Sequence, residues 1–151
     1  DIPEGIQIIW QSGKFYDKEA GEAIKATGKV AVKQSAFITR MDLAYDVADL
    51  VISRAGASSI SELCLLGKPS ILVPSPNVAE DHQTHNAMAL VRKDAAVLVK
   101  DMDAKVQMVE TALSLIQDDE RLKILHENIL TLALPDSARL IAKEVMKLAK
   151  K

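Results

Sequence analysis

The chain has 151 residues, of which 48% are hydrophobic, 26% charged and only 3% aromatic, and its formal net charge at pH 7 is −2. This length suits one domain with an aliphatic core, and the mixed charges offer no basic surface for nucleic acid. No apolar run approaches the roughly 20 residues of a membrane-spanning helix, so we expect no such helix in this sequence.

Two single positions add to these limits. Cys64 is the only cysteine. It falls among the apolar positions of a predicted helix, so we expect it in the core of a protein from a reducing, cytoplasmic setting. The chain begins at Asp1, without an initiator methionine, and leads almost directly into a strand. We therefore expect a fragment of a longer protein.

Strands and helices are expected to alternate along the chain. Strands are expected at residues 6–10, 30–33, 50–52, 70–73 and 96–99. Helices are expected at residues 17–27, 43–47 and 60–66, around 88–91, and at 101–117, 118–131 and from 137 onward. The last three helices are expected to pack on the sheet and to bridge to a neighbouring domain. This alternation predicts an α/β, Rossmann-like fold, a parallel sheet with helices on both faces.

A hydrophobic pair follows the second predicted strand. Phe37 and Ile38 are interpreted first as core residues. The alternative is that they line a slot for a flat base, with the backbone of Ile38 offering an amide and a carbonyl group.

A turn of small residues follows the predicted strand at 50–52. It reads Ala55-Gly56-Ala57, comes directly after Ser53 and Arg54, and leads into Ser58 and Ser59. Such a turn lets the backbone approach a ligand closely, and the N–H groups at the start of a helix suit a phosphate or diphosphate. The alternative is a capping box, in which Ser59 caps the helix and Glu62 reaches back to it, with no ligand involved.

A polar cluster at residues 80–87 follows the predicted strand at 70–73. Asp81 or Thr84 could cap the helix that begins here. Gln83 and Asn86 would share one face of that helix, and their amides suit sugar hydroxyls because they donate and accept together. The neighbouring histidines and acids could suggest a metal site, but without an HExxH motif or a cysteine partner we expect none.

Four stretches, in this order and spacing, resemble the donor-binding half of the MurG family of glycosyltransferases. They are Gln11-Ser12-Gly13-Lys14, Phe37-Ile38 with Met41, Ser53 to Glu62, and Asp81 to Ala87. The resemblance covers nearly the whole chain. It implies one half of a GT-B fold, whose enzymes of this family transfer N-acetylglucosamine with inversion from UDP-N-acetylglucosamine to lipid I, making lipid II for peptidoglycan.

The resemblance also implies roles for individual residues. The backbone of Ile38 would read the uracil edge, with Phe37 and Met41 beside it, and Glu62 would accept both ribose hydroxyls. The phosphate-binding residues would be Arg54, Gly56, Ala57, Ser58 and Ser59. The sugar-binding residues would be Ala57, Gln83 and Asn86. The resemblance places no catalytic residue and no metal ligand in this chain, and no cofactor is expected to be obligatory.

The rest of the expected protein follows from the same resemblance. Residues 1–151 would form a single UDP-sugar donor-binding domain that lacks its first strand. The acceptor domain, the general base and the surface that docks on the cytoplasmic face of the inner membrane would lie upstream, so this chain alone would be inactive. A missing central strand would leave sheet edges open to self-association.

Three other functions stay open from the residues. A sugar-nucleotide epimerase would need its own acid and base, for which His82 and His85 are the candidates. A stand-alone binding subunit that works with a membrane partner would carry its own first strand. A Rossmann-like domain for another nucleotide would show no preference for UDP over ADP or NAD.

Overall fold

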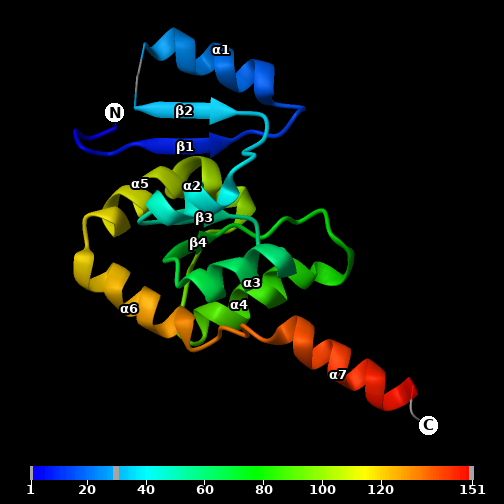
Figure 1. Cartoon of the computed structure of the whole chain (residues 1–151). Coiled ribbons are helices and arrows are strands. Elements are labelled where there is room, and N and C mark those ends of the chain that lie inside the picture. The colour runs from blue at the N-terminus through cyan, green and yellow to red at the C-terminus, as the bar shows by residue number, and fades with distance from the viewer. Residues whose placement is uncertain (1, 29–30, 150–151) are drawn as a thin grey trace. The chain divides into compact units, whose positions relative to one another are not determined.

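The computed structural model describes residues 2–28 and 31–149 of the chain (Figure 1). The chain divides into two compact units, unit 1 (Asp1–Val47) and unit 2 (Ala48–Lys151). The sequence-based division into one domain of 151 residues stays a prediction. The first residue of the strand expected at 30–33 lies outside the described residues.

Unit 1 is a strand–helix–strand arrangement followed by a short helix. Its elements are β1 (Ile8–Gln11), α1 (Asp17–Thr27), β2 (Val32–Ser35) and α2 (Met41–Val47). β1 and β2 are parallel, with Ile8 opposite Val32 (Figure 1). Helix α1 begins with acidic residues and ends at Gly28, whose φ of 64° is readily adopted by glycine. These residues therefore give both ends of α1 a local cause.

Unit 2 continues the alternation. Its strands are β3 (Val51–Ser53), β4 (Ser70–Leu72) and β5 (Val97–Leu98). Its α-helices are α3 (Ala57–Leu66), α4 (His82–Val91), α5 (Ala104–Ile116), α6 (Asp119–Leu130) and α7 (Ser137–Ala149). Two short 3₁₀ helices, η1 (Ala79–Asp81) and η2 (Asp101–Asp103), precede α4 and α5. The prediction of parallel strands alternating with helices is confirmed.

The strands of unit 2 form one parallel sheet in the order β3-β4-β5. Ser53 pairs with Leu72, and Leu72 pairs with Leu98, so the three strands end at nearly the same level. Since the strands are parallel, the loops that follow them leave from one edge of the sheet, where ligands bind in open α/β folds. Among the described residues, no ladder joins this sheet to β1-β2. The absence of the domain's first strand, which the resemblance implies, stays a prediction.

The central strand β4 is buried on both faces. Its side chains alternate between the faces, and Ile71 and Leu72, which point to opposite faces, are both fully buried. The core cluster on one face comprises Ile71, Val73, Val99, Leu115 and Leu125. Leu115 belongs to α5 and Leu125 to α6. The prediction that these two helices pack on the sheet is thus confirmed.

The last helix does not follow that prediction. No described residue of α7 is buried, and apolar side chains such as Ile141 and Val145 are exposed. In Figure 1 α7 extends away from the other helices of unit 2. The expectation that α7 packs on the sheet is wrong, because the core above β4 is already filled by α5 and α6. Among the described residues, no helix combines the length and the apolar character needed to cross a membrane.

Candidate functional site

The turn after β3 leaves the start of α3 without a side-chain cap. Gly56 occupies the N-cap position in an extended conformation (φ −68°, ψ 146°), and no side-chain cap hydrogen bond is formed there. The first helical bond runs from Ile60 N to Gly56 O, at 3.0 Å. The backbone N–H groups of Ala57, Ser58 and Ser59 precede that bond, so they lie at the positive end of the helix dipole. This arrangement suits an anion.

The capping-box interpretation of the same turn is wrong. Helix α3 begins at Ala57, so Ser59 is its third residue and not its cap. The helix starts earlier than expected because the extended backbone of Gly56 already provides the N-cap. Glu62 lies further along α3 as an exposed residue, and its ribose-binding role stays a prediction.

The amide of Asn86 supports this turn from α4. Its Nδ2 donates to the backbone carbonyl of Ala55 at 3.1 Å, and Ala55 is fully buried. Gln83, three residues earlier in α4, accepts from the backbone N–H of Ser75 through its Oε1 at 2.9 Å. The two amides therefore hold the loops that follow β3 and β4. Asn86 Oδ1 and Gln83 Nε2 take no part in these two bonds, and the predicted sugar contacts stay predictions.

The loop before α4 has an unusual backbone. Glu80 and Asp81 have φ values of 54° and 50°, in the left-handed region that favours glycine. Asp81 occupies the N-cap position of α4 without a side-chain cap bond, and instead accepts from Thr84 Oγ1 at 2.7 Å. His82 Nδ1 lies 2.8 Å from the carbonyl of Ala79. This loop thus keeps its shape through contacts among its own residues.

The described residues contain no group of three or more His, Cys, Asp or Glu side chains able to hold a metal ion. The prediction that no cofactor is obligatory is untested by this observation. Cys64 is buried in α3, and burial raises the pKa of its thiol above the ordinary value. The prediction that Cys64 is a core residue is confirmed.

Arg54 is held by the protein itself. Its Nη1 donates to the carbonyls of Val73 at 3.2 Å and Pro74 at 3.4 Å, and it forms an ion pair with Asp101. Sequence reasoning gave Asp101 no part in the site, since it lies far along the chain in η2. Only the order of the parallel strands brings the two residues together. The phosphate contact expected of Arg54 stays a prediction.

The three residues expected at the uracil lie in unit 1. The backbone N–H of Ile38 donates to Gln11 Oε1 at 2.8 Å. Phe37 is 67% exposed, so its interpretation as a core residue is wrong. Met41 is half-buried at the start of α2. Gln11 was part of a recognised stretch, but sequence reasoning gave it no role. Its contact with Ile38 depends on the turn after β2.

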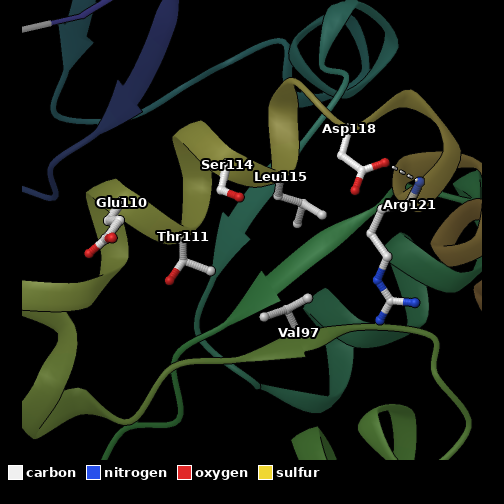
Figure 2. A pocket seen from close by; sticks show the side chains of 7 residues that line it. All are labelled: Val97, Glu110, Thr111, Ser114, Leu115, Asp118 and Arg121. Carbon is white, nitrogen blue, oxygen red and sulfur yellow. Dashed lines mark hydrogen bonds between the residues drawn. The ribbon is translucent and has the colours of Figure 1, made fainter.

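Two pockets in unit 2 contain none of the predicted site residues. One, of about 370 Å³, is lined by Val97, Glu110, Thr111, Ser114, Leu115, Asp118 and Arg121 (Figure 2). Its arginine is engaged by Asp94, which limits what else it can bind. The other lies near Ala48 and Pro69, where β3 and β4 begin. The predicted site residues of unit 2 instead follow the carboxyl ends of the strands.

Parallel β–α units, with a glycine turn after a strand that leads into a helix, define a Rossmann-like domain. The family model of the glycosyltransferase family 28 C-terminal domain matches residues 2–144 of the chain. The chain belongs to this family.

Relatives and a solved structure agree with this assignment. A Parabacteroides distasonis protein, named as a UDP-N-acetylglucosamine–N-acetylmuramyl-(pentapeptide) pyrophosphoryl-undecaprenol N-acetylglucosamine transferase, is 60% identical over 97% of the chain. A Bacteroides thetaiotaomicron protein of the same name is 59% identical over 95% of it. The chain spans 40% and 39% of these relatives.

The crystal structure of Acinetobacter baumannii MurG matches 93% of this chain and 43% of that one, with a TM-score of 0.82 and 26% sequence identity. The resemblance to the MurG family and the predicted fold class are thereby confirmed. The roles of the individual site residues are not tested by these comparisons.

Proposed function

We propose that the chain binds UDP-N-acetylglucosamine as the donor domain of an inverting N-acetylglucosaminyltransferase that makes lipid II from lipid I. The observation that carries the proposal is the start of α3, which has no side-chain cap bond and whose preceding turn is held at Ala55 by Asn86. The names of the relatives support the choice of sugar nucleotide and acceptor. The general base and the acceptor site would belong to the part of those relatives that this chain does not match.

Within this proposal each residue has a chemical task. In unit 1 the backbone of Ile38 reads uracil beside Phe37 and Met41. In unit 2 the N–H groups of Ala57 to Ser59 hold the diphosphate, and Glu62 accepts the ribose hydroxyls because a carboxylate can accept two hydrogen bonds from a diol. The sugar-binding residues are Ala57, Gln83 and Asn86.

The reaction is a single displacement at the anomeric carbon. The acceptor hydroxyl attacks that carbon in line with the departing UDP, so the new bond forms as the bond to the β-phosphate oxygen breaks. The hydroxyl proton passes to the general base, which would belong to the part of the relatives that this chain does not match. Negative charge grows on the diphosphate, where fixed N–H groups at the start of α3 stabilise it. No step requires a metal or a cofactor from this chain. The complete protein would act peripherally on the cytoplasmic face of the membrane, where its lipid acceptor lies, and self-association remains part of the proposal.

Calorimetric titration tests the proposal. UDP, UDP-N-acetylglucosamine, ADP and NAD are titrated into two proteins. One is this chain alone, and the other is a chimera in which this chain replaces the matching segment of the full-length Parabacteroides distasonis relative. We expect binding of UDP and its sugar conjugate and a clear preference over ADP and NAD. Equal binding of all four would favour a general nucleotide-binding domain. Release of an epimerised sugar without an acceptor would favour an epimerase.

Glu62→Ala should weaken binding of the donor by about 1 to 3 kcal/mol, the cost of losing hydrogen bonds to a charged group. The measurement is the Kd of UDP for the chimera with the Parabacteroides distasonis relative. Glu62→Gln is the matched variant, since it keeps the size and one acceptor oxygen and should lose less. Because Glu62 is exposed, the free energy of unfolding should change little. An unchanged Kd in Glu62→Ala would remove Glu62 from the ribose site.

Gln11→Ala should strengthen binding of uridine by about 1 kcal/mol, the net value of one hydrogen bond. In the structure Gln11 Oε1 occupies the N–H of Ile38, at 2.8 Å, which the base must use. Removing this acceptor leaves the N–H free for uracil. The Kd of uridine is the readout, and Gln7→Ala, on an exposed residue just before β1, is the control. Weaker uridine binding in Gln11→Ala would show that Gln11 supports the base site instead.

A further inference from the structure

One guanidinium group contacts the segments that follow all three strands of the unit 2 sheet. Arg54 comes directly after β3. Its Nη1 lies 3.2 Å from the carbonyl oxygen of Val73 and 3.4 Å from that of Pro74, which come directly after β4. The same nitrogen pairs with Asp101, which follows β5 in η2. Arg54 therefore joins the carboxyl ends of β3, β4 and β5.

The Arg54–Asp101 pair also fixes the turn that leads into α3. Ala55 follows Arg54 directly, is fully buried, and accepts a hydrogen bond from Asn86 at 3.1 Å through its carbonyl. The backbone is thus held at two successive residues. Arg54 contacts the segment after β4 and η2, and Ala55 contacts α4. The N–H groups of Ala57 to Ser59 come next in the chain. Holding donors in place before the ligand arrives avoids the cost of ordering them on binding.

The charge of Arg54 is already matched. Any diphosphate oxygen that reached Nη1 would also approach the carboxylate of Asp101, and like charges at such distances repel strongly. The two side chains are 55% and 37% exposed, so the ion pair by itself adds little to the free energy of unfolding. The contact therefore has more effect on the shape of the turn than on the stability of the fold.

We propose that Arg54 and Asp101 are positioning residues: together they hold the turn before α3 so that its N–H groups meet the diphosphate, and Arg54 does not itself bind phosphate. This inference rests on the proposed function. It replaces the sequence-based role of Arg54 as a phosphate ligand with a role exerted through the backbone of residues 55–59.

The sign of the effect of Asp101→Asn separates the two roles. The Kd of UDP is measured in the chimera with the Parabacteroides distasonis relative. The variants are Arg54→Gln, Asp101→Asn and the double variant. Positioning predicts that each single change weakens UDP binding by about tenfold, as for a lost charge-assisted hydrogen bond, and that the double variant is no weaker than the worse single one. The Kd of uridine, which has no phosphate, should not change.

Direct binding of phosphate by Arg54 predicts a different pattern. Asp101→Asn would then leave UDP binding unchanged or strengthen it, because a negative charge is removed, and either result would overturn the proposal. Arg121→Gln breaks the ion pair with Asp94 in the same unit and serves as the control for loss of an exposed pair. The Kd of UDP for Arg121→Gln should equal that of the parent protein.

Amide hydrogen exchange without any ligand keeps this test separate from the proposed function. In the 151-residue chain, Asp101→Asn should speed exchange at Ile60, whose N–H donates to Gly56 O at 3.0 Å, and leave α6 unchanged. If exchange there is not faster, the proposal fails. If it is faster while the parent binds no UDP, the proposed function fails and the positioning of the turn stands.

Discussion

Ser58→Asp should stabilise the chain and, at the same time, weaken binding of UDP by about a hundredfold. Ser58 is an exposed residue in the first turn of α3, which contains no acidic residue. A carboxylate there interacts favourably with the helix dipole and should add about 0.3 to 1 kcal/mol to the free energy of unfolding. The stability gain is read from urea unfolding of this chain.

The loss of affinity has the opposite electrostatic cause. If the diphosphate binds at this helix start, the new carboxylate lies about 5 Å from it, and repulsion at an effective dielectric constant near 20 costs about 3 kcal/mol. That energy corresponds to about a hundredfold in Kd. Raising the salt concentration should recover part of the loss, because exposed charges are screened.

Two comparisons control this prediction. Ser58→Asn introduces nearly the same shape without the charge, so it should leave UDP affinity close to that of the parent. Uridine lacks phosphate, so its Kd should be the same for all three proteins. If Ser58→Asp stabilised the chain and UDP still bound with the parent affinity, the diphosphate would not lie at the start of α3, and the proposed function would lose its main support.

Helix and strand positions were largely predictable because their signals are local. Helix 17–27 has the bounds expected from its acidic start and the glycine at its end. The end of α3 was likewise set by Gly67, which has a φ of 64°. The start of α3 was misjudged because two local patterns competed there, a serine–glutamate capping box and an extended glycine. The second provides the N-cap.

The contacts within the site were not predictable in the same way. Gln83 and Asn86 could be placed on one helix face from their spacing, but the partner of Asn86 is 31 residues away. Asp101 is 47 residues from Arg54. Such pairs depend on the order of strands and the level at which they end, which hydrophobic periodicity does not encode. The exposure of Phe37 and of α7 likewise depends on what packs against them, and periodicity alone specifies only an apolar face.

Gly67→Ala should lower the free energy of unfolding by about 3 kcal/mol, from backbone strain and overpacking together. Gly67 ends α3 in the left-handed conformation, and Lys68 N donates back to the carbonyl of Leu63 at 3.0 Å, as in a Schellman motif. A Cβ at Gly67 would lie 2.7 Å from Cε1 of His126 and 2.9 Å from Cδ2 of Leu130. His126 cannot withdraw cheaply, because its Nδ1 lies 2.6 Å from the carbonyl of Gly67.

Gly28→Ala is the matched control, since Gly28 ends α1 with the same φ of 64° but has nothing within 4 Å of an added Cβ. Gly28→Ala should lower the free energy of unfolding only through backbone strain, by about 1 kcal/mol. The difference between the two variants in urea unfolding then measures the steric term. Adding His126→Ala to Gly67→Ala should recover part of that difference, because it removes the ring that the new methyl group meets. Equal losses for Gly67→Ala and Gly28→Ala would mean that α6 moves aside easily, and that the end of α3 is not held by His126.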